Sequence, residues 1–233
     1  MRHGNSRVHW LLVSLIFLSL GWSGLGGVIE SEFLSRSRQL IFDGRRSGEG
    51  YFSPDGKQMV FQSERELSNP FYQIYRLDLE SGDTLRLSTG LGKTTCSFFR
   101  PGSDEVLFAS THLDPEAAAK QKAELDFRAS GKTRRYSWDY DAQMELFIVR
   151  RDGTALRRLT QSPGYDAEGA FSPDGRFIVF CSLRDAYPVE KLSSEDRKRL
   201  ETDPAWFGEI YIMRVESFDS PILQRLCLSH ERK

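Results

Sequence analysis

The sequence predicts an all-β fold, because one turn motif recurs along the chain and a β-prone run follows each copy. Residues 52–56 and 171–175 are both Phe-Ser-Pro-Asp-Gly, and residues 99–103, Phe-Arg-Pro-Gly-Ser, are a degenerate third copy. Proline fixes φ at the first central position of a turn, aspartate can bond back to the backbone, and glycine accepts a positive φ. We therefore expect a turn at each copy. The residues expected to have structural roles there are Pro54, Asp55, Gly56, Pro173, Asp174 and Gly175.

Each repeat contains four short β-prone runs in the same order. In the third repeat these runs are residues 170–171, 176–180, 209–213 and 224–226. A four-stranded unit that recurs at about 40–50 residues is typical of a propeller blade, and blades stack side by side because one blade cannot bury both of its faces. The sequence therefore predicts a partial β-propeller of about three four-stranded blades with two helical insertions.

Four segments make the chain resemble the TolB-like, WD40-like propellers of bacterial envelope proteins. They are the turn at 171–175, the strand end at 180–182, Ile210-Tyr211-Ile212-Met213, and Arg157-Arg158-Leu159-Thr160. The resemblance covers roughly Arg38 to His230 and implies the fold. Repeats of this family occur in translocation-associated proteins, in binding proteins and as accessory domains of peptidases, so the resemblance implies no single function.

The first residues follow a different pattern. Arg2 and Arg7 precede an apolar run from Trp10 to Leu20, and the glycine-rich residues 21–27 follow it. This order is typical of a secretory signal peptide, which we predict for residues 1–27. The alternative is a membrane anchor helix that is not cleaved, since an uncharged stretch of about 20 residues can span a bilayer. The propeller is accordingly expected to be periplasmic or secreted, or else anchored to the inner membrane outside the cytoplasm.

The spacing of the repeats divides residues 38–230 into four segments. They are an orphan outer strand at 38–47, a blade at 48–90, a blade at 95–162 with an insertion at 113–142, and a blade at 167–230 with an insertion at 184–208. Known propellers typically close with four to eight blades. We therefore expect this chain to be a truncated propeller with further blades in cis, or to self-associate.

Each insertion is predicted to contain a helix, with capping signals at its ends. The signals are Asp114 at the N-cap, Pro115 at the first helical position and Gly131 past the end of the first helix, then Ser193 or Ser194 at the start and Asp203-Pro204 at the end of the second. Because blade strands alternate in direction, both insertions should lie on the face where the inner strands begin.

That face is the predicted binding surface, because binding residues tend to lie on loops held by a rigid scaffold, and aromatic and arginine residues are enriched at interface anchors. Glu49 and Glu168 lie 119 residues apart and are therefore equivalent positions of the first and third repeats, and Cys96 takes their place in the middle repeat. These glutamates either line a polar channel, bind a cation or are solvated. Trp138 and Trp206 alternatively pin the insertions to the blades. The candidate binding residues are Glu49, Tyr136, Trp138, Asp139, Asp166, Glu168, Arg184, Asp185, Tyr187 and Trp206, with Arg134, Arg135, Tyr140 and Phe207 beside them.

Composition and motifs argue against several classes of function. The net charge of −1 predicts no broad attraction to nucleic acid or to an anionic membrane. The sequence contains no Gly-x-Ser-x-Gly nucleophile motif and no glycine-rich phosphate loop. Cys96, Cys181 and Cys227 lack the spacing of a metal site and are predicted to be buried thiols. We therefore predict no catalytic residue, no metal, no cofactor and no nucleic acid partner.

The sequence thus predicts an exported, non-catalytic module that binds or scaffolds a protein or peptide partner in the cell envelope. The family resemblance also implies an alternative, the N-terminal propeller of a secreted prolyl-oligopeptidase-like serine peptidase whose catalytic domain is missing from this chain. Contact with a membrane is expected only through an uncleaved leader.

Overall fold

The computed structural model describes residues 34–135, 139–215 and 224–226. The chain divides into two units after Leu40, and the described residues of the first, 34–40, contain no helix or strand. The predicted leader at 1–27 lies outside the described residues. In the described part of the chain, no helix has the length and apolar character needed to cross a membrane.

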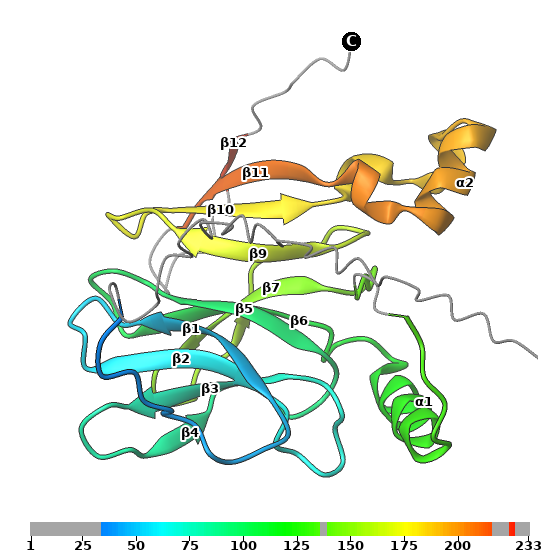
Figure 1. The fold of residues 1–233 in the computed structure, drawn as a ribbon. Coiled ribbons are helices and arrows are strands. Elements are labelled where there is room, and N and C mark those ends of the chain that lie inside the picture. Colours follow the sequence, from blue (N-terminus) through cyan, green and yellow to red (C-terminus); the bar gives the residue numbers. More distant parts are fainter. Residues whose placement is uncertain (1–33, 136–138, 216–223, 227–233) are drawn as a thin grey trace, which may run out of the picture. The chain divides into compact units, whose positions relative to one another are not determined.

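Each repeat forms one four-stranded antiparallel sheet with its strands in sequence order (Figure 1). The first sheet contains β1 (Ser47–Phe52), β2 (Gln58–Ser63), β3 (Gln73–Asp78) and β4 (Thr84–Arg86). The second contains β5 (Thr94–Phe99), β6 (Glu105–Ser110), β7 (Glu145–Arg150) and β8 (Arg157–Arg158). The third contains β9 (Asp166–Phe171), β10 (Phe177–Ser182), β11 (Glu209–Arg214) and β12 (Gln224–Leu226). The prediction of four strands per repeat is therefore confirmed.

The recurring motif forms the turn that links the first two strands of each sheet. The amide of Gly56 donates to the carbonyl of Ser53 (2.8 Å), and Gly56 has a φ of 68°. The Ser53 hydroxyl donates to Oδ1 of Asp55 (2.6 Å) and accepts from the amide of Gln58 (2.9 Å). Ser172, Asp174 and Gly175 repeat this arrangement in the third sheet. Side chains within the motif thus satisfy the backbone groups of the turn.

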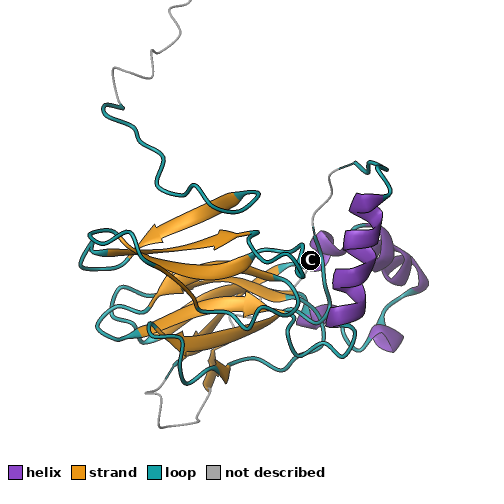
Figure 2. Ribbon diagram, turned by 90° about the horizontal axis from the view of Figure 1, so that it is seen from below, coloured by secondary structure: helices purple, strands orange, loops and turns teal. Residues whose placement is uncertain are grey.

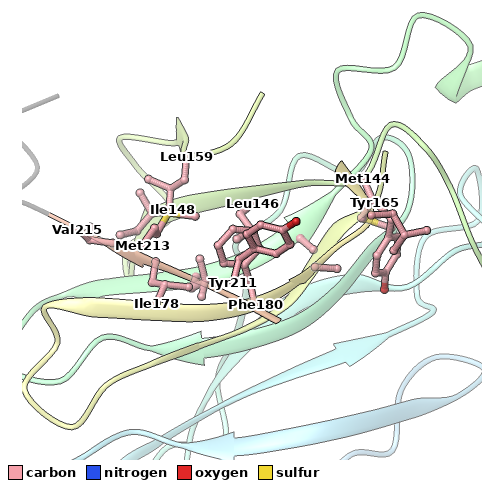
Figure 3. Close-up of a cluster of buried hydrophobic side chains, with 14 of the residues drawn as sticks. Met144, Leu146, Ile148, Leu159, Tyr165, Ile178, Phe180, Tyr211, Met213 and Val215 are labelled. Carbon is pink, nitrogen blue, oxygen red and sulfur yellow. The ribbon is translucent and has the colours of Figure 1, made fainter. Parts of the chain in front are cut away.

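Neighbouring sheets pack face to face through apolar side chains. Val60 and Ile74 of the first sheet lie in one buried cluster with Phe99, Val106 and Phe147 of the second. A larger cluster joins the second sheet to the third, and Figure 3 shows Leu146 and Ile148 opposite side chains of β10 and β11. Burying each such side chain stabilises the fold by about 1.5–3 kcal/mol. These two clusters are the cores that hold the three sheets together.

Arg100 makes a polar link between the second and third sheets. It takes the place of serine in the degenerate turn, and its Nε donates to the carbonyl of Gly175 (2.8 Å) while the guanidinium lies 5.6 Å from the centre of the Phe171 ring. The turns are close at this point, because a Cβ added to Gly175 would lie 2.7 Å from the carbonyl oxygen of Pro101. Glycine is therefore needed at 175 both for its φ of 68° and for the approach of the neighbouring turn.

Both insertions contain the predicted helix, α1 (Ala117–Ala129) and α2 (Ser194–Thr202), and Figure 2 shows the helices gathered at one end of the strands. The predicted N-cap of the first helix is wrong. Glu116 is the N-cap, and Asp114 closes a preceding turn in which its Oδ1 accepts from the amide of Glu116 (2.9 Å). Gly131 follows the helix with a φ of 69°, as expected. Ser193 caps α2 by accepting from the amide of Asp196 (3.0 Å), and Asp203 is its C-cap.

The predicted outer strand at residues 38–47 is not a strand in the structure. Residues 38–46 have no strand conformation, and Ser47 is the first residue of the inner strand β1. The outer position of the first sheet is taken by β4, which pairs with β3. A strand forms only where a neighbouring ladder accepts its backbone groups, and each of the three described sheets already has its own outer strand, so none of them accepts this orphan segment.

We expect Gly175→Ala to destabilise the protein more than Gly56→Ala. Both glycines have a φ of 68°, but a Cβ at 56 meets nothing within 4 Å whereas a Cβ at 175 meets the Pro101 carbonyl. The left-handed conformation alone should cost about 1–2 kcal/mol in each variant, and the overlap should add about 1–3 kcal/mol at 175. Urea denaturation measures both, and equal losses would contradict the proposed close approach.

Candidate functional site

Each inner strand contains a β-bulge with one strained residue. The pairing of β1 with β2 shifts between Gly48 and Tyr51, and β5 and β9 have shifts at the equivalent places. The strained residues are Glu49, Cys96 and Glu168, with φ angles of 49°, 51° and 58°. A positive φ in a non-glycine residue costs on the order of 1–3 kcal/mol, and a bulge redirects a side chain. The three residues that the repeat spacing aligns therefore share one unusual backbone conformation.

These bulge residues interact electrostatically. Burial raises the pKa of the Cys96 thiol to about 12; its hydrogen bond with the Thr95 hydroxyl opposes the shift, and the carboxylates of Glu49 and Glu168 add to it. Cys96 is half-buried, whereas both glutamates are exposed. The thiol is therefore protonated at neutral pH and is not a nucleophile. The bulges present two carboxylates, with a neutral thiol between them in the repeat order.

A row of tyrosines connects the two insertions to the third bulge. The hydroxyls of Tyr140 and Tyr187 lie 2.6 Å apart, and the rings of Tyr140 and Tyr165 have centroids 6.3 Å apart. The hydroxyl of Tyr165 donates to Oε1 of Glu168 (3.4 Å). Gly164 allows this packing, because a Cβ there would lie 2.8 Å from the Tyr187 ring. Sequence reasoning missed Tyr165, which lies just before the inner strand and matches no aromatic residue in the other repeats.

Two candidate residues, Asp166 and Arg184, form a buried ion pair. Nη2 of Arg184 donates to Oδ2 of Asp166 (2.8 Å), and Asp166 is completely buried. Burial raises the pKa of Asp166, while the Ser182 hydroxyl and the Arg184 guanidinium oppose that shift. The guanidinium also lies over the rings of Phe180 and Tyr211, at 5.1 and 4.8 Å. The pair joins β9 to the second insertion and does not face solvent.

A second buried carboxylate, Glu145, lies near Asp166. Its Oε1 accepts from Nη2 of Arg158 (2.6 Å), and its Oε2 accepts from the Thr160 hydroxyl. Burial raises the pKa of Glu145, Thr160 and Arg158 oppose the shift, and the charge of Asp166 adds to it. The equivalent residue in the first sheet is Gln73, which accepts from the Ser88 hydroxyl (2.7 Å). An uncharged side chain is therefore compatible with this position at the start of the third strand of a sheet.

The first insertion is braced against the first repeat. Nη1 of Arg128, near the end of α1, donates to Oε2 of Glu64 (3.1 Å), and its Nη2 donates to the carbonyl of Pro70 (2.8 Å). Among the candidates here, Asp139 accepts from Nζ of Lys93 (2.6 Å), and Arg134 is paired with Glu124. Arg135 is exposed. Tyr136 and Trp138 lie outside the described residues.

In the second insertion, Phe207 is the residue that pins the segment to the sheet. Phe207 is 3% exposed and belongs to the large core cluster, whereas Trp206 beside it is 59% exposed. The guanidinium of Arg199 from α2 lies 4.6 Å from the centre of the Trp206 ring, which leaves the indole at the surface. Asp185 is also exposed. Trp206 therefore has the exposure that a contact residue needs.

This arrangement suits recognition by hydrogen bonds, charge and aromatic contact. Among the residues that the structure describes, no group of three or more His, Cys, Asp or Glu side chains is placed to hold a metal ion. His112 lies with its ring 4.3 Å from that of Phe147, and its Nδ1 is 2.9 Å from the Ser110 hydroxyl. The accessible groups at this end include the carboxylates of Glu49, Glu168 and Asp185 and the indole of Trp206.

Comparison with known proteins agrees with the repeat motifs, although no family model matches the sequence. The chain is 26% identical over 148 residues to a protein TolB homolog from Chlorobium luteolum, in a match that covers 57% of this chain and 33% of that protein. A shorter segment of 45 residues is 47% identical to the Tol-Pal system protein TolB of Bordetella pertussis, so the chain is similar to TolB proteins over part of its length. It spans about a third of the length of the Chlorobium luteolum relative.

The chain is also similar to a protein named as a peptidase. The chain is 25% identical over 146 residues to the uncharacterized peptidase YuxL of Bacillus subtilis, covering 59% of this chain and 22% of that protein. Among solved structures, putative TolB from Agrobacterium tumefaciens has a TM-score of 0.48 and 19% identity, over 80% of this chain and 50% of that one.

We expect Glu145→Gln to fold and to alter the dependence of stability on pH. Because the folded-state pKa of Glu145 is raised above its ordinary value of 4.5, the ionised carboxylate reduces stability at neutral pH. That stability returns as pH falls through the folded-state pKa towards the unfolded value. The free energy of unfolding of the wild type should therefore rise relative to that of the glutamine variant as the pH is lowered from neutral.

Urea denaturation at neutral and mildly acidic pH measures this difference. Glu195→Gln is the control, because the side chain of Glu195 is 81% exposed and its removal should leave the pH dependence of the wild type nearly unchanged. A difference between wild type and Glu145→Gln that stays constant with pH would show that Glu145 does not titrate as inferred.

Proposed function

We propose that this chain is an exported, non-catalytic binding module that takes a segment of a protein or peptide partner at the end of the sheets where the insertions lie. The observation that supports this most is the row of contacts from Tyr187 through Tyr140 and Tyr165 to Glu168. It joins both insertions to a strained inner-strand bulge. A surface built from three chain segments and held by buried side chains is organised before a partner arrives, which lowers the entropic cost of binding.

The exposed groups define the partner by its chemistry. Glu49 and Glu168 are exposed carboxylates in strained bulges, and Trp206 is an exposed indole. Backbone strain of this kind clusters at ligand clamps and switch regions. Tryptophan is enriched among residues that carry binding energy. We therefore expect a partner segment with a lysine, arginine or free amino group next to an apolar side chain.

The proposed location is outside the cytoplasm. The basic, apolar and small-residue order of residues 1–27 supports export, and the similarity to a protein TolB homolog is consistent with a role in the cell envelope. Under this proposal the module is periplasmic or secreted after cleavage of the leader, or is anchored in the inner membrane by it.

The second candidate function is the propeller of a secreted serine peptidase, which the similarity to YuxL favours. In that protein the chemistry would belong to another domain, and the described face would contact that domain or its substrate. Sequencing the gene beyond the codon for Lys233 separates the two candidates. A hydrolase domain with a Gly-x-Ser-x-Gly motif would favour the peptidase, and its absence would favour the binding module.

We expect Glu49→Gln combined with Glu168→Gln to weaken partner binding by at least about tenfold, or 1.4 kcal/mol. Random short peptides displayed on phage are selected on the immobilised chain, and the affinity of the selected peptides is measured by fluorescence anisotropy. The selected peptides should be enriched in lysine or arginine, because the removed carboxylates are their expected contacts.

The matched control is Glu80→Gln combined with Asp104→Asn, which removes the same charge from exposed residues in turns at the opposite end of the strands. Its affinity should stay within about twofold of the wild type. Peptides that bind both double variants equally well, or a selection that yields no binder, would overturn the proposed site.

A further inference from the structure

Equivalent apolar residues are buried in two of the sheets and exposed in the third. On the face of each sheet that looks towards the following repeat, Val60 and Ile74 of the first sheet are both 0% exposed. Leu107 and Leu146 at the same places in the second sheet are also 0% exposed. In the third sheet the equivalent residues are Val179 and Ile210, which are 42% and 71% exposed. The third sheet therefore presents an apolar face that the other two sheets cover.

The structure shows what covers this face in the other repeats. Phe99, the last residue of β5, lies in the cluster with Val60 and Ile74. Phe171, the last residue of β9, lies in the cluster with Leu107 and Leu146. In each case the cover is a four-stranded sheet that brings its inner-strand phenylalanine. In the described residues, no sheet follows the third and covers Val179 and Ile210.

The first sheet carries the matching half of this contact. Phe52 is equivalent to Phe99 and Phe171, which are 2% and 6% exposed, but Phe52 itself is 67% exposed. The rest of that face is already covered within the chain, because Ile41 packs against the buried side chains of Phe61, Tyr75 and Leu77. The guanidinium of Arg65 also lies over the Phe61 and Tyr75 rings, at 5.2 and 4.9 Å. Arg184 covers Phe180 and Tyr211 in the same way, although the third sheet packs there against the second.

From these exposures we infer that a second copy of this chain covers the third sheet, placing its Phe52 over Val179 and Ile210. Phe52 cannot reach Val179 and Ile210 within one molecule, because the second sheet lies between the sheets that carry them. Two copies satisfy both surfaces at once, since each copy donates one Phe52 and receives one.

The size of the resulting ring and the charge of the chain are both compatible with this dimer. Three sheets per copy give a ring of six, within the four to eight blades that closed propellers typically have. The net charge of −1 puts little repulsion between the copies. The other possible occupant is a further repeat of a longer chain, and it would leave this chain monomeric by itself.

The mass of the purified full chain in solution tests the dimer. Size-exclusion chromatography with light scattering should give twice the mass of the denatured chain, over a range of protein concentrations. Ile210→Asp and Phe52→Asp should each weaken the dimer by at least about tenfold. Leu67→Asp is the control, because Leu67 is 98% exposed and lies in the β2–β3 loop away from both faces.

A mixture of the two aspartate variants separates loss of the contact from loss of folding. The Ile210→Asp chain keeps an intact Phe52, and the Phe52→Asp chain keeps an intact Val179 and Ile210 face. At a concentration at which each variant alone is monomeric, their mixture should form a heterodimer through one intact contact. A wild-type chain that stays monomeric at all concentrations would overturn the inference and favour the further repeat. An Ile210→Asp dimer that is as tight as the wild-type dimer would overturn it as well.

Discussion

The structure depends on the burial of both faces of small four-stranded sheets. A sheet of this size cannot form a core by itself, so its apolar faces must be covered by neighbours. Val60 and Ile74 are covered by the second sheet, and Leu107 and Leu146 by the third. The same requirement makes the exposure of Phe52, Val179 and Ile210 informative, because these residues occupy positions that are buried wherever a neighbouring sheet exists. Stability and assembly are in this way two results of one packing rule.

The two ends of the strands have different roles. At one end the Ser-Pro-Asp-Gly turns satisfy their own backbone groups, and Arg100 links one turn to the next by donating to the carbonyl of Gly175. At the other end the insertions are joined through the Tyr140–Tyr187 contact, and the bulges hold Glu49 and Glu168 at positive φ. The turns at the first end satisfy their own backbone groups. The backbone strain at the second end occurs in all three repeats, and the bulges that carry it change the direction in which side chains are presented.

Burial distinguishes the candidate residues that stabilise the fold from those that can contact a partner. Asp166 and Arg184 are candidate binding residues because they are charged and lie near the insertions. Their ion pair is buried, however, and the guanidinium of Arg184 lies over two aromatic rings. Removing either partner would leave an uncompensated charge in the interior, which is costly. Trp206 and Phe207 differ in the same manner, since the buried phenylalanine holds the segment and the exposed tryptophan is available for contact.

Local chemistry determined a large part of this structure. The turn residues, the four runs per repeat, the Ser193 cap and the glycine after α1 follow from φ preferences, side-chain capping and β-propensity, and all of them hold in the structure. The equivalence of Glu49, Cys96 and Glu168 also followed from the repeat spacing alone. The first helix start was misplaced because an aspartate before a proline can close a turn as well as cap a helix.

Only the tertiary structure decided which side chains are buried and which meet across the repeats. The sequence did not show the bulges. A bulge adds one residue to one strand and so interrupts the alternation of apolar residues by which a strand is recognised. Tyr165 contacts Tyr140 and Glu168, and whether Tyr140 lies close to Tyr165 in space depends on the path that the first insertion takes. Sequence patterns record the preferences of neighbouring residues, whereas contacts between sheets depend on how whole faces fit together.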